Sequence, residues 1–193
     1  MEELTRGAAG SGIRWTTRDL EVLPENEWIR YEIIDGELFV ARAPHRKHQQ
    51  VCVKIARQLD SWSEASGLGE VVISPGIIFS DTDNVIPDLV WVSRSLLTQT
   101  EDEAGHLTAA PELVIEVLSA GPENLRRDRE AKLKLYSLKG VREYWIVDRF
   151  ARQLEVYRRD KAQLVLVITL LEEDEITSPL LPGFGVTVSK FLV

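Results

Sequence analysis

The sequence lacks several features that mark the more specialised classes of protein. Cys52 is the single cysteine, so no intrachain disulfide can form and a disulfide-stabilised scaffold is excluded. No apolar run approaches the ~20 residues of a membrane-spanning helix, and residues 1–12 lack the apolar stretch of a signal peptide. Repeats and low-complexity blocks are also absent. We therefore predict a cytoplasmic protein without a membrane anchor, in which Cys52 is a small buried hydrophobe.

The remaining composition is that of an ordinary globular protein. The chain has 193 residues, of which 44% are hydrophobic and 28% charged, and this length is enough to bury a sizeable core. The Gly- and Ala-rich start predicts a disordered N-terminal segment at residues 1–15. We expect residues 16–193 to form a single domain.

Positive charge is scarce overall but concentrated in two stretches. The net charge of -8 disfavours a protein that coats nucleic acid through bulk electrostatics. Residues 38–59, however, contain five basic residues and no acid, and residues 124–142 contain seven basic residues and two acids. Two interpretations remain open: the stretches are solvated helix faces, or they flank a site that binds an anion.

Short apolar runs and two long helical patterns predict the fold class. Residues 30–34 and 37–41 are β-prone and joined by Asp35-Gly36, which is typical of a tight hairpin. The first helix follows Pro44 and the second runs over about 123–138. We predict an α/β (α+β) fold in which helices flank a mixed central sheet, with an N-terminal hairpin and a C-terminal β extension.

Glu116 is the most unusual residue of the chain. It interrupts the apolar run 113–118, which predicts a strand covered on both faces, and an ionised carboxylate there is costly unless a cation neutralises it. Asp88 opens the predicted strand that follows Pro87. Neighbouring strands lie ~5 Å apart, so on adjacent strands both carboxylates would reach one ion, and hard oxygen ligands favour Mg²⁺ or Mn²⁺. Alternatively, Asp88 is a strand-end residue and Glu116 pairs with an arginine.

Lys132 lies on the inner face of the second predicted helix. On a wheel of ~100° per residue it falls within an apolar arc, with Asp128 one turn before it. The arc contains Leu125, Ala131, Leu135, Tyr136 and Leu138, and the polar side contains Arg126, Arg127, Glu130, Lys134 and Ser137. An inward ammonium near two carboxylates can hold a phosphate oxygen, or orient an attacking water and stabilise the transition state. The alternative is a snorkelling lysine whose stem covers apolar surface.

Four motifs occur in a defined order along the chain. They are Tyr-Glu-Ile-Ile-Asp-Gly-Glu-Leu at 31–38, Pro-Asp at 87–88, Pro-Glu-Leu-Val-Ile-Glu-Val-Leu-Ser at 111–119 and Gly-Val-Arg-Glu-Tyr-Trp-Ile-Val-Asp at 140–148. With these motifs the chain resembles the Uma-two family of restriction endonuclease-like proteins, a branch of the PD-(D/E)XK nuclease superfamily. The resemblance runs from about residue 16 to the C terminus.

This resemblance implies a restriction-endonuclease-like core with defined site residues. Asp88 would be the first metal-binding acid and Glu116 the second, with the backbone carbonyl of Val117 also facing the metal. The superfamily pattern has a lysine two residues after the second acid, where this chain has Leu118. In this branch the lysine is thought to have moved to the following helix, which Lys132 fits.

Two further residues match positions typical of the family. Glu32 and His48 would supply an additional metal ligand or a proton carrier. The alternatives are that Glu32 is an exposed hairpin residue and that His48 is a hydrogen-bonded core residue.

The leading functional prediction is a Mg²⁺- or Mn²⁺-dependent endonuclease that hydrolyses DNA. The alternative is a catalytically inactive nuclease-fold module that binds nucleic acid or a protein partner, and a third interpretation is a structural ion-pair core without metal. A homodimer is expected by analogy with double-strand cutters of this fold.

Overall fold

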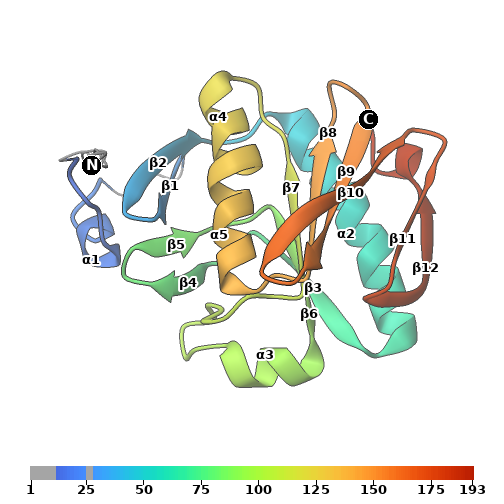
Figure 1. Ribbon diagram of the computed structural model, residues 1–193, viewed down its shortest axis with the longest axis horizontal. Helices are drawn as coiled ribbons and strands as arrows, with labels where there is room; N and C mark the ends of the chain where they lie inside the picture. Colours follow the sequence, from blue (N-terminus) through green and yellow to red (C-terminus); the bar gives the residue numbers. More distant parts are fainter. Residues whose placement is uncertain (1–11, 25–27) are drawn as a thin grey trace, which may run out of the picture.

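The computed structural model describes residues 12–24 and 28–193, which contain three β-sheets (Figure 1). The largest has six strands in the order β10-β9-β8-β7-β6-β3. Its strands are β3 (Gly69–Ile73), β6 (Leu89–Ser93), β7 (Leu113–Val117), β8 (Glu143–Asp148), β9 (Gln153–Asp160) and β10 (Gln163–Leu171). β7 and β8 are parallel and the other neighbours are antiparallel. This mixed central sheet is the one predicted from the sequence.

Helices cover both faces of this sheet. In Figure 1, α2 (Arg46–Ser66) passes behind it, and α4 (Pro122–Arg126) with α5 (Lys132–Lys139) lies in front. Side chains of β7 alternate between the two faces, so Ile115 packs in the apolar cluster of α2, and Val114 packs in that of α5. By the same alternation Glu116 belongs to the face that α5 covers.

A second sheet lies beside the α5 face. It has the order β2-β1-β5-β4 and consists of β1 (Ile29–Ile34), β2 (Glu37–Arg42), β4 (Ile77–Ser80) and β5 (Asp83–Val85). Asp35 and Gly36 form the β1–β2 turn with φ angles of 50° and 75°, the positive values that a two-residue hairpin needs. The predicted N-terminal hairpin is confirmed. Phe39 and Val85 share an apolar cluster with Leu135 of α5.

The C-terminal segment covers part of the α2 face. β11 (Glu175–Ser178) and β12 (Leu181–Thr187) pair with each other and are followed by a short 3₁₀ turn (Val188–Lys190). Phe184 and Phe191 pack close to Trp145 of β8. This hairpin is the β extension predicted from the sequence. The remaining helices are α1 (Thr17–Leu20) and α3 (Arg94–Thr100).

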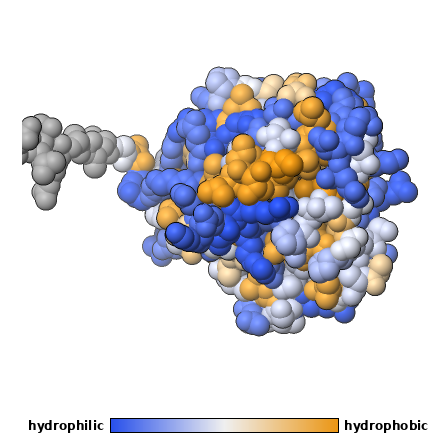
Figure 2. All heavy atoms as spheres, turned by 45° about the vertical axis from the view of Figure 1, so that its right-hand side comes forward, coloured by the Kyte–Doolittle hydropathy of each residue, from blue (hydrophilic) through white to orange (hydrophobic). Residues whose placement is uncertain are grey.

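Strand β10 is an edge of the six-stranded sheet and carries exposed apolar side chains. Leu166, Val167 and Ile168 are each about half exposed. Figure 2 turns this side of the molecule forward and shows an apolar band bordered by hydrophilic residues. The homodimer expected from the sequence stays a prediction, because the structure describes one chain.

The start of the chain is only partly described. Residues 1–11, most of the segment expected to be disordered, lie outside the described residues. Farther on, Trp15 N–H donates to the carbonyl of Gly36, and Arg14 pairs with Asp35 on the hairpin turn. Within the described part of the chain, no helix has the length and apolar character required to span a membrane.

Candidate active site

The register of β6 and β7 brings the two predicted acids together. Leu89 pairs with Ile115 in this antiparallel ladder, so continuing the register by one residue sets Asp88 opposite Glu116. Cross-strand partners of this kind have Cβ atoms ~5 Å apart. The two strands are thus neighbours, which is the condition under which both carboxylates can reach one ion, and both carboxylates line one cavity at this end of the sheet.

Asp88 is held by backbone and by helix α2. Its Oδ2 accepts a 2.8 Å hydrogen bond from Val117 N–H and lies 3.1 Å from His48 Nε2. Burial opposes ionisation of Asp88, but the bonds from His48 and Val117 prevail and lower the pKa of the carboxyl below its usual value. The N–H and C=O of one strand residue project from the same edge, so the Val117 carbonyl also faces β6.

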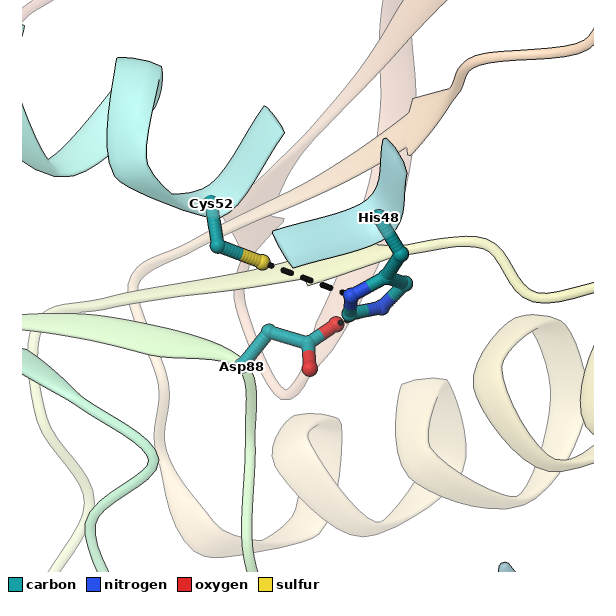
Figure 3. Close-up of side chains that lie close together, drawn as sticks. All are labelled: His48, Cys52 and Asp88. Carbon is teal, nitrogen blue, oxygen red and sulfur yellow. Dashed lines mark hydrogen bonds and ion pairs between the residues drawn. The ribbon is translucent and has the colours of Figure 1, made fainter. Parts of the chain in front are cut away.

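His48 lies between Asp88 and Cys52, as Figure 3 shows. His48 and Cys52 belong to α2, one turn apart, and Cys52 Sγ is 3.6 Å from His48 Nδ1. Burial, reinforced by the charges of Asp88 and Glu116, raises the pKa of the Cys52 thiol. A protonated thiol donates to Nδ1, which leaves Nε2 as the nitrogen that donates to Asp88. The ligand-type atoms of His48, Cys52 and Asp88 lie within 4.8 Å of one another. Here the thiol and the carboxylate bind the two ring nitrogens and so fix the imidazole.

Glu116 and Glu32 share one ammonium group. Lys132 Nζ lies 2.8 Å from Oε1 of each carboxylate, and Tyr136 Oη donates to Glu116 Oε1 at 3.3 Å. Glu32 Oε1 also accepts the Ile86 N–H at 2.7 Å. Glu32, Glu116 and Lys132 are 3%, 2% and 1% exposed, respectively. The alternative in which Glu32 is an exposed hairpin residue is therefore wrong.

The buried charges perturb one another. Burial raises the pKa of Glu116 well above its ordinary value; Lys132 counteracts this, and the charges of Asp88, Asp128 and Glu32 reinforce it. Burial alone would lower the pKa of Lys132, but Glu116 and Glu32 outweigh it and raise the pKa. Lys132 therefore stays protonated near neutral pH. Its ammonium donates a hydrogen bond to Glu116 and forms an ion pair with Glu32, and Lys132 is also one of the residues that line the cavity.

A π-helical turn aligns the helix with the site. Residues 127–131 form this turn between α4 and α5, and the additional residue shifts the helical phase relative to a regular wheel. Asp128 is fully buried and Arg127 points inward, with its Nε 2.7 Å from Asp128 Oδ1 and 3.7 Å from Glu32 Oε2. The wheel prediction was wrong for Arg127, expected in solvent, and for Leu125 and Leu138, which are exposed. It was right for Lys132.

Among the described residues, the buried acids of the site outnumber the lysine and arginine side chains that pair with them. Glu32, Asp88, Glu116 and Asp128 form the cluster, and among the described residues only Lys132 and Arg127 make permanent ion pairs with these four. Because the pKa of Glu116 is raised, the cluster holds either a proton or a further cation.

Each predicted metal ligand also has an oxygen available. In the described part of the chain, no hydrogen bond reaches Asp88 Oδ1 or Glu116 Oε2, and neither atom is among the buried atoms without a partner. Both oxygens are therefore open to the cavity, whose volume is about 560 Å³. Two free carboxylate oxygens are donors of the kind that Mg²⁺ or Mn²⁺ prefers. Val117, the third predicted ligand, is buried and is not among the residues that line the cavity.

The structure brings the sequence-predicted residues to one place. Glu32, His48, Asp88, Glu116 and Lys132 all line the same cavity. Sequence reasoning missed Arg127 because the π turn leaves no recognisable sequence signal. It also missed Cys52 and Tyr136 as partners of site residues, because an apolar helix face predicts only burial. Leu118, at the position of the superfamily lysine, is fully buried in the apolar cluster of α5.

Comparisons with known proteins cover nearly the whole chain. A family model described as "Uma2: Putative restriction endonuclease" matches residues 17–189. Among solved structures, a crystal structure of "a putative nuclease belonging to DUF820 from Anabaena variabilis ATCC 29413" is similar, with a TM-score of 0.72 and 17% sequence identity over 91% of this chain and 96% of that one. At this identity the likeness establishes the fold. A search of curated proteins found no match.

Proposed function

The chain belongs to the Uma2 family of restriction endonuclease-like proteins, as its motifs predicted, and on this premise we propose that it is a Mg²⁺- or Mn²⁺-dependent endonuclease that hydrolyses DNA phosphodiester bonds. The observation that carries the proposal is the pair of open oxygens, Asp88 Oδ1 and Glu116 Oε2, on opposed strand positions at the base of a cavity. The buried ammonium of Lys132 lies 2.8 Å from the Glu116 carboxylate.

Asp88 and Glu116 would hold the metal, with the Val117 carbonyl as a third ligand. The ion would supply Lewis acidity towards a phosphate oxygen and lower the pKa of an attacking water. His48 and the Val117 N–H keep the Asp88 carboxylate ionised and oriented, because both bond its Oδ2. Oδ1 is thereby left for the ion.

Lys132 contributes charge rather than proton transfer. Its pKa is raised, so it is a poor general base. Lys132 lines the cavity, where its ammonium would donate to a phosphate oxygen and stabilise the charge that develops in the transition state. Glu32 keeps the ammonium in place from the other side. Lys132 of α5 would thereby take the role of the superfamily lysine, whose usual position is occupied by Leu118 in this chain.

Plasmid cleavage in Mn²⁺ tests this function. We expect the wild-type chain to nick or linearise the plasmid, and Asp88→Ala and Glu116→Ala to lose at least about 100-fold in rate, because each removes a ligand. Glu143→Gln is the matched control. Glu143 is a buried carboxylate bound to Trp145 and Ser178 and lies outside the cavity lining. Absence of cleavage by the wild-type chain, or full cleavage by both alanine variants, would refute the proposal.

A second candidate function is a nuclease-fold module that binds nucleic acid or a protein partner without catalysis. Leu118 favours it, because the superfamily lysine is missing from its usual position and the site there is apolar. Calorimetric titration with Mn²⁺ separates the two functions. A non-catalytic module has no need for an ion at Asp88 and Glu116, whereas the enzyme should bind Mn²⁺ and lose that binding in Glu116→Gln.

A further inference from the structure

The cavity carries a set of positively charged side chains that the metal chemistry does not use. Arg30 of β1, Arg42 of β2 and Arg149, directly after β8, line it together with the acids. We call these three residues the arginine rim. Arg42 is exposed and the other two are partly exposed, whereas Glu116 and Lys132 are buried. The rim therefore surrounds a cavity whose floor is acidic.

Among the described residues, the rim arginines have no carboxylate partners. Nearby Arg127 and Arg129 form ion pairs, but no ion pair or side-chain hydrogen bond of Arg30, Arg42 or Arg149 exists within residues 12–24 and 28–193. Arg149 is the most distinctive of the three. Its Nε is the one buried side-chain nitrogen or oxygen without a hydrogen-bond partner in the described chain, and a buried donor without a partner is destabilising unless a ligand satisfies it.

Arg149 lines the cavity from a turn whose local contacts restrict its side chain. Its guanidinium stacks on the ring of Phe150, 3.9 Å from the centroid, which restricts the side chain. Asp148 accepts the N–H groups of Phe150 and Ala151 and so fixes the turn in which Arg149 lies. This turn follows the carboxyl end of β8, next to the carboxyl end of its parallel neighbour β7, the usual edge for ligand binding in parallel sheets.

We propose that the arginine rim, with Arg149 as its principal member, binds a backbone phosphate of a DNA strand next to the phosphate held over Asp88 and Glu116. The chemistry that points to a phosphodiester is the pairing of an acidic floor, which attracts a cation, with guanidinium groups that have no ion-pair partner within the described part of the chain. Such groups bind phosphate oxygens through two parallel N–H bonds. This assignment rests on the proposed function for the identity of the ligand. It adds the residues that recognise the substrate.

Binding in EDTA tests the rim without any metal-dependent cleavage. The probe is a fluorescein-labelled single-stranded DNA oligonucleotide, followed by anisotropy over a series of salt concentrations. Arg149→Ala should weaken binding at least about tenfold, because it removes a charge-assisted hydrogen bond to a phosphate oxygen. It should also make the slope of log K against log salt less steep by about 0.7, the value for one phosphate contact on a single strand. Arg149→Lys should retain the slope but recover only part of the affinity, and Arg30→Ala should weaken binding to a smaller extent.

The matched control is Arg142→Ala. Arg142 is an exposed arginine at the other end of the same strand β8, outside the cavity lining, so its removal changes net charge equally. Equal losses for Arg142→Ala and Arg149→Ala would overturn the proposal in favour of bulk charge, as would failure of the wild-type chain to bind the oligonucleotide. Selective loss in Arg149→Ala without any plasmid cleavage in Mn²⁺ would uphold the rim and reject the nuclease.

Discussion

Replacement of Glu116 by glutamine separates a metal site from a structural ion pair, because a metal site predicts little change in the stability of the metal-free chain and an ion pair predicts a large loss. Glu116 pairs with Lys132, but Glu32 contacts the same Nζ at the same 2.8 Å. In Glu116→Gln the ammonium keeps Glu32, and the amide oxygen can still accept from Tyr136. The cluster also loses one of its excess negative charges. We therefore expect the free energy of unfolding without metal to change by less than about 1 kcal/mol.

The same substitution should abolish stabilisation by metal. For the wild-type chain, Mn²⁺ at about 100 times its dissociation constant adds about 2.7 kcal/mol to the free energy of unfolding. For a protein of this size that corresponds to a rise in Tm of about 5–11 °C. Glu116→Gln should lose most of this rise because it lacks a ligand oxygen. Glu143→Gln should be less stable without metal, since three groups bond that carboxylate, and should keep the full rise.

Differential scanning fluorimetry with and without Mn²⁺ measures both quantities. If the role of Glu116 is a structural ion pair, its loss should cost about 3–5 kcal/mol, or a fall in Tm of roughly 6–20 °C, and Mn²⁺ should have no effect on either protein. A fall of that size in the metal-free variant, or an equal Mn²⁺ response in wild type and Glu116→Gln, would refute the metal-site reasoning.

Three further predictions follow from the same cluster. Lys132→Met leaves Glu32 and Glu116 buried without their cation, so it should lower the free energy of unfolding in urea by about 3–5 kcal/mol. Cleavage should be lost even where Mn²⁺ restores the fold. Unchanged stability would show that the ammonium is dispensable. Leu118→Lys restores the superfamily motif but inserts an ammonium into the apolar cluster of α5, so it should destabilise the chain by several kcal/mol and not increase cleavage; a faster, stable variant would contradict this. The pH dependence of urea denaturation in metal-free buffer has opposite signs for the two acids. The folded-state pKa of Glu116 is raised, so its contribution to the free energy of unfolding is present below its unfolded value near 4.5 and is lost as the pH rises through the folded value. The folded-state pKa of Asp88 is lowered, so its contribution is present above its unfolded value of about 3.8 and is lost as the pH falls through the folded value. Comparison of wild type with Glu116→Gln and Asp88→Asn isolates each contribution, and parallel pH profiles would contradict both assignments.

Part of the site was predictable because its signals are local. A carboxylate inside the apolar run 113–118 indicates a buried charge whatever the tertiary structure, and the helical wheel showed that Lys132 points inward. The hairpin at Asp35-Gly36 was equally clear, because its turn needs positive φ angles. In each case a few consecutive residues contain the whole physical argument.

Other features could not be predicted from the sequence because they depend on contacts between distant segments. The family resemblance suggested Glu32 as an accessory residue, but its ion pair with Lys132 depends on β1 and the helix lying side by side, which the sequence does not show. The wheel failed for Arg127 because a single additional residue in the π turn rotates everything before it, and no composition rule signals such a turn. Arg149 gave no signal in the sequence, because its place in the cavity lining and its buried Nε without a partner among the described residues are properties of the folded chain.

The sequence by itself determined the elements, the family and which acid had to be neutralised, because burial patterns and motif order are properties of neighbouring residues. Only the tertiary structure decided how that neutralisation occurs. The antiparallel register set Asp88 opposite Glu116, and two helices from opposite faces of the sheet brought His48 and Lys132 to the same edge. The charge balance of a buried cluster is a sum over side chains from separate segments, and packing alone determines which of them belong to it.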